Sequence, residues 1–262
     1  MNETLERLPP LVFMVLFATL WLWEAVATAR PSGGDGLRRR RNLTVSLLNF
    51  LLGGLAAAAM LAASAWIATT GRGLTAWPGS AFAVIAGVLL LDMTDYWRHR
   101  VSHKWPLLWR LHRVHHTDPR IDLTTALRGH PIEQLMRPLF VVGAVVVFGI
   151  PQLAVLIYPL LGLPVLLFQH ANVRLPAPLD RALVWLISTP SMHLVHHSRR
   201  TVETDSNYAT GLTLWDRLFG TYSSSPSPHG IGLDGFDHPG HQTIRGMLHT
   251  PWEAAEQIAT GK

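Results

Sequence analysis

The chain has 262 residues, of which 48% are hydrophobic and 15% charged, a balance too apolar for a soluble enzyme of this size. It contains no cysteine, which excludes a disulfide scaffold, a thiolate zinc site and an iron–sulfur cluster. The net charge is +5, but the arginines are concentrated in blocks at 38–41 and 98–113, beside long apolar segments. This distribution is typical of membrane proteins, so we expect no nucleic-acid partner.

Three apolar segments, at 11–29, 43–70 and 80–96, are long enough to cross about 30 Å of hydrocarbon. A signal peptide is the alternative for the first segment. The residues before it carry Glu3 and Glu6, whereas a signal peptide begins with positive charge, so we expect a retained helix. Glu24 is expected at the interface or in the bundle interior. If the arginines at 38–41 face the cytoplasm, the third segment returns the chain to the cytoplasmic side.

Residues 135–169 are apolar but contain four prolines, which predicts a hairpin turning near Gly149. Each arm has about 17 residues, so a hairpin that only dips into the bilayer is the alternative to a full crossing. An amphipathic helix is expected at 175–188, and Thr189 and Pro190 are typical of the N-cap and first turn of the next helix.

The predicted fold is an all-α integral membrane protein. We expect a four-span helical bundle, made of two long spans, a third span and the proline-broken hairpin, with a cytoplasmic helical cap. The whole chain, 1–262, is expected to form a single domain. Membrane spans occupy 1–90, a histidine-rich core occupies 91–222, and a polar tail occupies 223–262.

Histidines recur in three clusters with spacings of three and four residues. Residues with these offsets share one face of a helix, so each cluster would present its imidazoles to one point. Neutral imidazole binds iron, copper, zinc and nickel, and eight ligands exceed what one ion can hold, so at least two ions are implied. The clusters are His99 and His103; His112, His115 and His116; and His193, His196 and His197.

Two further histidines, His130 and His170, would bring the total to ten, about five per ion with a position left open on each. Open positions imply reaction rather than structural binding, and a dinuclear redox centre at a membrane surface suggests oxygen activation. Each has an alternative interpretation. His130 precedes Pro131 and would simply cap a helix, whereas His170 would be a buried histidine satisfied by a carbonyl.

The alternative function is a histidine-rich membrane protein that binds metal or haem without oxygenase activity. Haem is disfavoured because two axial ligands must lie on opposite faces of one macrocycle, which neighbours on one helix cannot do. A transport site is disfavoured because such sites lie at bilayer depth on discontinuous helices, whereas these clusters follow the end of a span.

The chain resembles the fatty acid hydroxylase (sterol desaturase) superfamily of membrane-bound non-haem di-iron enzymes. The resemblance covers roughly 91–222 and rests on DMTDYWRHRVSH, LHRVHH, GHPIEQ, FQHANV, HLVHH and NYATGLTLWDRLFGTY. It implies two irons, molecular oxygen as co-substrate, and hydroxylation or desaturation of a C–H bond in a fatty acyl, sterol or related lipid. It also implies electrons from a separate donor of cytochrome, ferredoxin or reductase type.

On this resemblance the ten histidines are the metal ligands. Carboxylates should orient the ligating rings. The substrate chain would enter from the bilayer past Phe140, Leu166 and Phe168. The carboxylate candidates are Asp95, Asp118, Glu133 and Asp205, with caps or salt bridges to nearby arginines as the alternative for Asp95 and Glu133.

Overall fold

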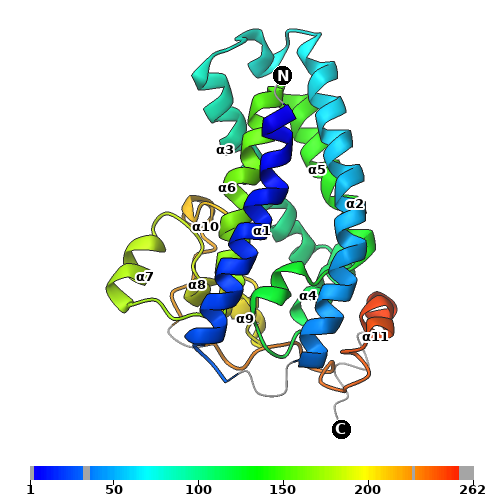
Figure 1. Cartoon of the computed structure of the whole chain (residues 1–262), viewed down its shortest axis with the longest axis vertical. Helices are drawn as coiled ribbons and strands as arrows, with labels where there is room; N and C mark the ends of the chain where they lie inside the picture. The colour runs from blue at the N-terminus through cyan, green and yellow to red at the C-terminus, as the bar shows by residue number, and fades with distance from the viewer. Residues whose placement is uncertain (1–2, 32–35, 226–227, 254–262) are drawn as a thin grey trace.

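The computed structural model describes residues 3–31, 36–225 and 228–253, and within these ranges it is helical and forms no β-strand. The long helices make the elongated part of the molecule (Figure 1), and most of the short helices gather at one end of it. The elements are α1 (Glu3–Val26), α2 (Gly36–Ala68), η1 (Gly73–Ala76), α3 (Ala81–Lys104), α4 (Pro106–His116), η2 (Leu123–Leu127), α5 (Pro131–Phe148), α6 (Gln152–His170), α7 (Ala177–Leu183), α8 (Pro190–His196), α9 (Thr201–Thr204), α10 (Leu214–Leu218), α11 (Ile244–His249) and η3 (Thr250–Trp252).

Three of the described helices, α2, α5 and α6, are long and apolar enough to cross a membrane, as in an integral membrane protein. The apolar part of α1, Pro10–Val26, is shorter. Helix α3, predicted as the third span, is not among the three because its second half carries Asp92, Asp95 and Arg98. The structure thus supports three apolar helices of spanning length, and the four-span count stays a prediction.

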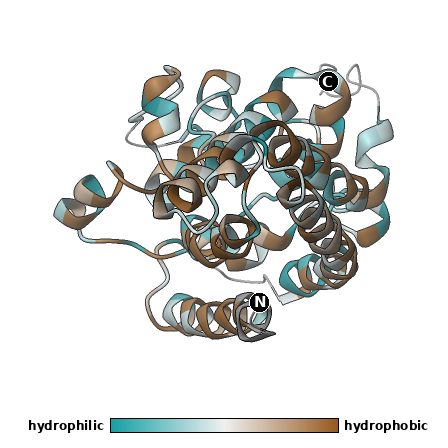
Figure 2. Cartoon of the chain, turned by 90° about the horizontal axis from the view of Figure 1, so that it is seen from above, coloured by the Kyte–Doolittle hydropathy of each residue, from teal (hydrophilic) through white to brown (hydrophobic). Residues whose placement is uncertain are grey.

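Hydrophobic residues make up much of the long helices, which Figure 2 shows in a view along the bundle, and many of their side chains are exposed. Leu55 on α2, Leu139 and Val147 on α5 are each about two-thirds exposed or more, at 67%, 66% and 73%. Such a surface would be unfavourable in water and is expected for helices that face lipid.

The predicted hairpin is confirmed. Helix α5 ends at Phe148 and α6 begins at Gln152, with Gly149 in the left-handed region at φ 62°. A Cβ on Gly149 would lie 2.1 Å from the carbonyl oxygen of Arg72, so this close approach requires glycine. The prolines within both helices are accommodated without ending them.

Other predicted boundaries shift. The first helix ends at Val26 rather than at residue 29, and the amphipathic helix expected at 175–188 is shorter, at Ala177–Leu183. Beyond the end of this helix, Ile187 forms a β-bridge with Leu212. The expected start of the next helix is confirmed: Thr189 Oγ1 accepts a hydrogen bond from Met192 N, and Pro190 occupies the first turn.

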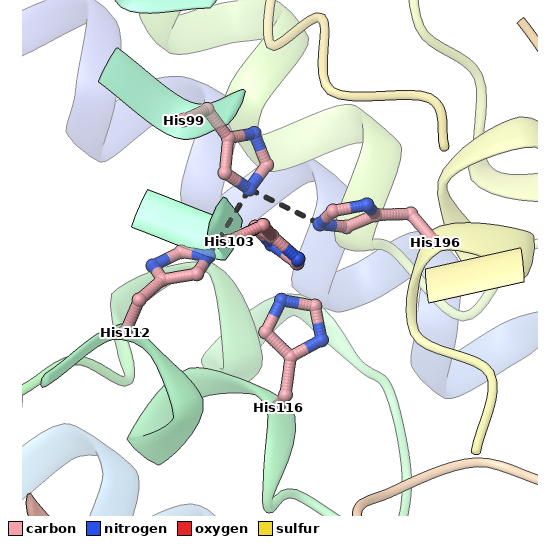
Figure 3. Close-up of side chains that lie close together, drawn as sticks. All are labelled: His99, His103, His112, His116 and His196. Atoms are coloured by element: carbon pink, nitrogen blue, oxygen red, sulfur yellow. Dashed lines mark hydrogen bonds between the residues drawn. The ribbon is translucent and has the colours of Figure 1, made fainter. Parts of the chain in front are cut away.

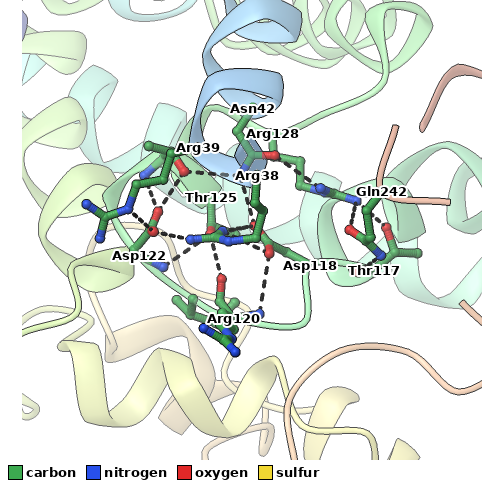
Figure 4. Close-up of polar contacts among 12 residues, drawn as sticks. Arg38, Arg39, Asn42, Thr117, Asp118, Arg120, Asp122, Thr125, Arg128 and Gln242 are labelled. Atoms are coloured by element: carbon green, nitrogen blue, oxygen red, sulfur yellow. Dashed lines mark hydrogen bonds and ion pairs between the residues drawn. The ribbon is translucent and has the colours of Figure 1, made fainter. Parts of the chain in front are cut away.

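A buried polar network, which we call the clamp, fastens the start of α2 to the segment between α4 and η2 (Figure 4). Arg38 Nη1 donates to both carboxylate oxygens of Asp118, at 2.9 and 2.8 Å, and Arg38 Nη2 donates to Asp122. One turn along α2, Asn42 Nδ2 donates to Asp118 at 3.0 Å. Because all four side chains are buried, the clamp fixes where α4 ends.

Glu24 lies in the bundle interior, one of the two places expected for it. Its side chain is buried, and Oε1 accepts hydrogen bonds from Leu123 N at 2.8 Å and Asn172 N at 2.6 Å. Glu24 therefore joins α1 to η2 and to the chain just after α6, which carries His170.

Candidate metal centre

Nine of the ten predicted ligand histidines come together at the end of the bundle where the short helices gather. They form two groups, and one nitrogen from each ring in a group lies within 4.8 Å of the others. All nine side chains are buried. The first group, drawn in Figure 3, is His99, His103, His112, His116 and His196. The second group is His115, His170, His193 and His197.

The two HxxHH clusters are each split between the groups. On α4, His112 and His116 enter the first group and His115 enters the second. On α8 the division is reversed, because His193 joins its i+4 neighbour in the second group while His196 joins the first. Residues four apart are separated by only about 40° around a helix, but adjacent residues by about 100°. The expectation that each cluster points to a single place is therefore wrong for these two.

Five rings are oriented by hydrogen bonds from Nδ1 to an oxygen acceptor. Because a carbonyl or carboxylate oxygen only accepts, Nδ1 carries the proton in each ring and Nε2 is left with a bare lone pair. The donors and acceptors are His99 to Tyr208 O at 2.6 Å, His112 to Glu133 Oε1 at 2.8 Å, His115 to Arg128 O at 3.0 Å, His170 to Leu166 O at 2.8 Å and His196 to Ser206 O at 2.7 Å.

The bare Nε2 atoms face one another. In the first group His99 Nε2 lies 3.1 Å from the Nε2 atoms of both His112 and His196. In the second group His170 Nε2 lies 3.1 Å from His115 Nε2. No proton is available between these pairs, so the lone pairs repel unless a cation lies among them. The donor set therefore fits two metal ions.

Burial supports the same conclusion. It lowers the pKa of His115, His116, His193 and His197 well below the ordinary value of 6.5, and neighbouring histidines lower it further. For His196, burial lowers the pKa to about 3. These five rings are therefore neutral at physiological pH, which is the state that ligates metal.

Residues 84–221, more than half of the chain, match the family described as fatty acid hydroxylase. The chain belongs to the fatty acid hydroxylase family. The resemblance found in the sequence is thus confirmed, and the matched region contains all nine clustered histidines.

Three relatives illustrate the range of this family. The chain is 33% identical over 168 residues to an ornithine lipid hydroxylase, OlsE, of Rhizobium tropici, a match that covers 61% of this chain and 47% of the relative. It is 34% identical over 150 residues to an alkylglycerol monooxygenase of Xenopus tropicalis, covering 57% and 32%. It is 27% identical over 153 residues to the fatty acid hydroxylase vlmA of a Lecanicillium species, covering 51% and 40%. The matches therefore span less than half of each relative, and no solved structure matches the chain significantly.

Four carboxylates were expected to orient the histidine rings, and two of them lie close to a ring nitrogen. Glu133 accepts from His112, as above, and Asp205 Oδ1 lies 3.5 Å from His103 Nδ1. Asp95 instead accepts from Arg98 Nε at 2.7 Å, and Arg98 Nη1 lies 3.8 Å from Glu133 Oε1. Asp118 belongs to the clamp. Glu133 is thus the carboxylate best placed to orient a ligand.

His130 lies outside both groups. Its Nδ1 accepts a hydrogen bond from Ile132 N at 3.2 Å as the N-cap of α5, and its Nε2 donates to Leu248 O at 3.2 Å. Both ring nitrogens are therefore occupied, and the capping alternative describes the residue. We leave His130 out of the proposed ligand set, whereas His170 is in the second group.

Sequence reasoning missed the backbone acceptors of the family site, including the carbonyls of Tyr208 and Ser206, because no residue type marks a carbonyl. It also missed Gln169, a buried residue beside His170. A glutamine at the end of a long apolar run, directly before His170, was an available signal.

Three cavities lie on the bundle side of the histidines. The histidine-facing cavity has about 40 Å³ and is lined by residues that include His99, His112, His115, His170, His193 and Gln169. The bundle cavity, of about 310 Å³, lies among α2, α3, α5 and α6. The lateral cavity, of about 500 Å³, lies between α1 and α2. Of the residues expected along the substrate path, Leu166 lines all three, whereas Phe140 and Phe168 line none of them.

Proposed function

We propose that the chain is an O₂-dependent di-iron hydroxylase or desaturase that acts on a C–H bond of a lipid, with electrons from an external donor protein. The observation that carries the proposal is the pair of buried histidine groups in which bare Nε2 atoms face one another. Family membership and the two apolar cavities leading to these groups add support.

In this proposal the five-histidine group holds one iron and the four-histidine group holds the other. The irons would supply oxygen activation, with one oxygen atom inserted into the C–H bond, the other released as water, and two electrons and two protons taken up. In the desaturation alternative, two hydrogens leave the substrate and both oxygen atoms become water.

The protein's own groups set the geometry. Glu133 and the backbone carbonyls hold the rings with Nε2 directed inward, because each fixes the proton on Nδ1. Leu166 and the apolar walls of the cavities bind the hydrocarbon part of the substrate and exclude water from the histidines.

We propose a lipid substrate because the relatives are named for action on ornithine lipid, alkylglycerol and fatty acid. The four-span arrangement and a cytoplasmic active site belong to the same proposal. Arg38 contacts Asp118, so the arginine run at 38–41 lies at the histidine end of the bundle. Arginines accumulate on the cytoplasmic side, which supports a site facing that compartment.

Metal analysis and an absorption spectrum of the purified protein test the proposal. We expect two irons per chain and no Soret band. A strong Soret band would support haem binding, and one weakly held ion without oxygen consumption would support a protein that only binds metal.

A matched pair of histidine variants tests the ligand assignment. His115→Ala is expected to lower bound iron and abolish turnover, because it removes one of the four rings of the second group. His130→Asn retains an N-cap and is expected to keep both irons. Full iron and activity in His115→Ala would refute the assignment.

A further inference from the structure

Gln169 is a buried amide whose oxygen and nitrogen both lack a hydrogen-bond partner within the described part of the chain. Its side chain is only 1% exposed, and it lines the histidine-facing cavity beside His170. An unpaired buried polar group costs stability, and here one side chain holds two of them. A protein retains such a destabilising side chain where its polar atoms bind a ligand. An amide that offers a donor and an acceptor side by side fits an ester, amide or hydroxyl group.

The three cavities converge beside this amide. Gln134, Arg137 and Leu166 line the histidine-facing cavity, the bundle cavity and the lateral cavity alike. The two larger cavities, of about 310 and 500 Å³, are each within the range of roughly 300–1,000 Å³ typical of ligand sites. The bundle cavity and the lateral cavity are therefore two apolar arms that meet at one polar junction, which is formed by Gln134, Arg137 and Gln169.

The arms run in the direction that lipid chains take in a leaflet. On α6 the bundle cavity extends from Leu166 back to Val155, eleven residues or about 16 Å at 1.5 Å per residue, away from the histidines. The lateral cavity reaches the outer surface at Leu47 and Phe50, which are 64% and 66% exposed. A lipid entering between α1 and α2 keeps its polar group at the histidine end and its chains toward the bilayer interior.

The junction also holds a charged side chain on a helix of spanning length. Arg137 lies in the second turn of α5, a helix of spanning length, and its Nη2 is 3.7 Å from Asp95 Oδ1. Ionisable residues within such helices are costly and mark substrate sites by default. Together with Gln134 and Gln169, Arg137 makes the junction suited to a polar group rather than to the middle of a hydrocarbon chain.

We propose that the substrate is a two-chain polar lipid, anchored by its polar linkage at Gln169 and oxidised at a carbon close to that linkage. This inference rests on the proposed function. The histidine-facing cavity has room for about one small group, at about 40 Å³, and its polar lining would receive the linkage region. With the polar linkage held at Gln169, beside His170, the carbons nearest the linkage are the ones that lie next to the histidines.

Binding to metal-free protein tests the anchoring without turnover. Chelator-treated protein is mixed with a phospholipid carrying two 16-carbon chains, or with its single-chain lyso form of the same head group, and complexes are quantified by native mass spectrometry. We expect the two-chain lipid to bind at least tenfold more tightly. Equal binding of the lyso form would overturn the two-chain inference.

A glutamine variant tests the anchor itself. Gln169→Leu is expected to weaken binding of the two-chain lipid about three- to tenfold, since each net hydrogen bond contributes modestly. The same variant is expected to raise the melting temperature of lipid-free protein, because it removes two unpaired buried polar atoms. Gln152→Leu, at the far end of the same helix, is the matched control and should leave lipid binding unchanged. Unchanged binding in Gln169→Leu would overturn the anchor.

The position of the inserted oxygen completes the test on iron-loaded protein. Fragmentation of the product should place oxygen in the head group, at the linkage or on the first chain carbons. Oxygen in mid-chain would refute the inference while leaving the proposed oxygenase intact. Absence of iron and oxygen consumption would refute the proposed function while leaving the lipid-binding results to stand on their own.

Discussion

Glu133→Gln tests how much the negative charge of Glu133 contributes to the iron affinity of the first histidine group. Glu133 Oε1 accepts from His112 Nδ1 at 2.8 Å, and glutamine retains an oxygen acceptor of nearly the same size without the charge. Hydrogen bonds to charged groups contribute about 1.5–3 kcal/mol and neutral ones about 0.5–1.5 kcal/mol. The midpoints differ by about 1.3 kcal/mol, which corresponds to roughly a tenfold loss of iron affinity. This loss is at the lower end of the range of about 10–100-fold typical for residues that orient metal ligands.

Asp205→Asn makes the same chemical change beside another ring of the same group. Asp205 Oδ1 is 3.5 Å from His103 Nδ1, longer than a strong hydrogen bond, and its side chain is 26% exposed and paired with Lys104. Water and Lys104 already screen this carboxylate, so we expect its loss to change iron affinity by less than about twofold.

Competition with a chelator of known iron affinity measures both variants, and the iron retained at each chelator concentration gives the two affinities separately. The decisive result is which variant loses more iron affinity, and we expect the larger loss in Glu133→Gln. Equal losses in the two variants, or a larger loss in Asp205→Asn, would show that distance and burial do not control the contribution of these carboxylates.

Two further predictions concern the stability of the metal-free protein. Arg38→Met removes the partner that Asp118 and Asp122 share, and should lower the free energy of unfolding in denaturant by about 3–5 kcal/mol. Arg40 is exposed, so Arg40→Met is the control and should leave the free energy of unfolding nearly unchanged. Similar values for both variants would refute the role of the clamp. Lower pH should also destabilise it. Burial lowers the folded pKa of five clustered histidines below the unfolded value near 6.5, so the unfolded chain binds more protons, and stability is lost from about pH 6.5 down toward the folded pKa of His196, about 3. The five are His115, His116, His193, His196 and His197. A melting temperature that stays constant between pH 7 and 5 would contradict this.

The features that sequence predicted well are those that local spacing determines. A proline-rich apolar stretch with Gly149 at its centre produced the hairpin, because the left-handed turn and the close approach to Arg72 both require glycine. Thr189 followed by Pro190 marked a helix start for the same kind of reason. Clustered histidines at helical spacing indicated that imidazoles would meet, and all eight of them do, together with His170.

The features that sequence missed depend on how helices are rotated about their axes and on backbone atoms. A histidine before a proline is compatible with both ligation and capping, and only the position of Leu248 O shows that the Nε2 of His130 is occupied. The orienting carbonyls of Tyr208 and Ser206 come from a segment with little regular structure, and their direction follows from tertiary packing alone. Likewise, spacing does not reveal that His115 and His116 serve different groups.

That division makes the two histidine groups mechanically dependent on each other. Helix α4 gives two rings to the first group and one to the second, while α8, with the residue that follows it, does the reverse. A rotation of α4 that improved His112 and His116 for one ion would move His115 away from the other. The ligand geometry of one group therefore depends on that of the other. The position of α4 has to be fixed by residues outside both groups. The clamp does this, since Arg38 and Asn42 hold Asp118 two residues beyond the end of α4. Arg38, the first arginine of the run from which we propose the cytoplasmic side, thus also positions the proposed metal ligands.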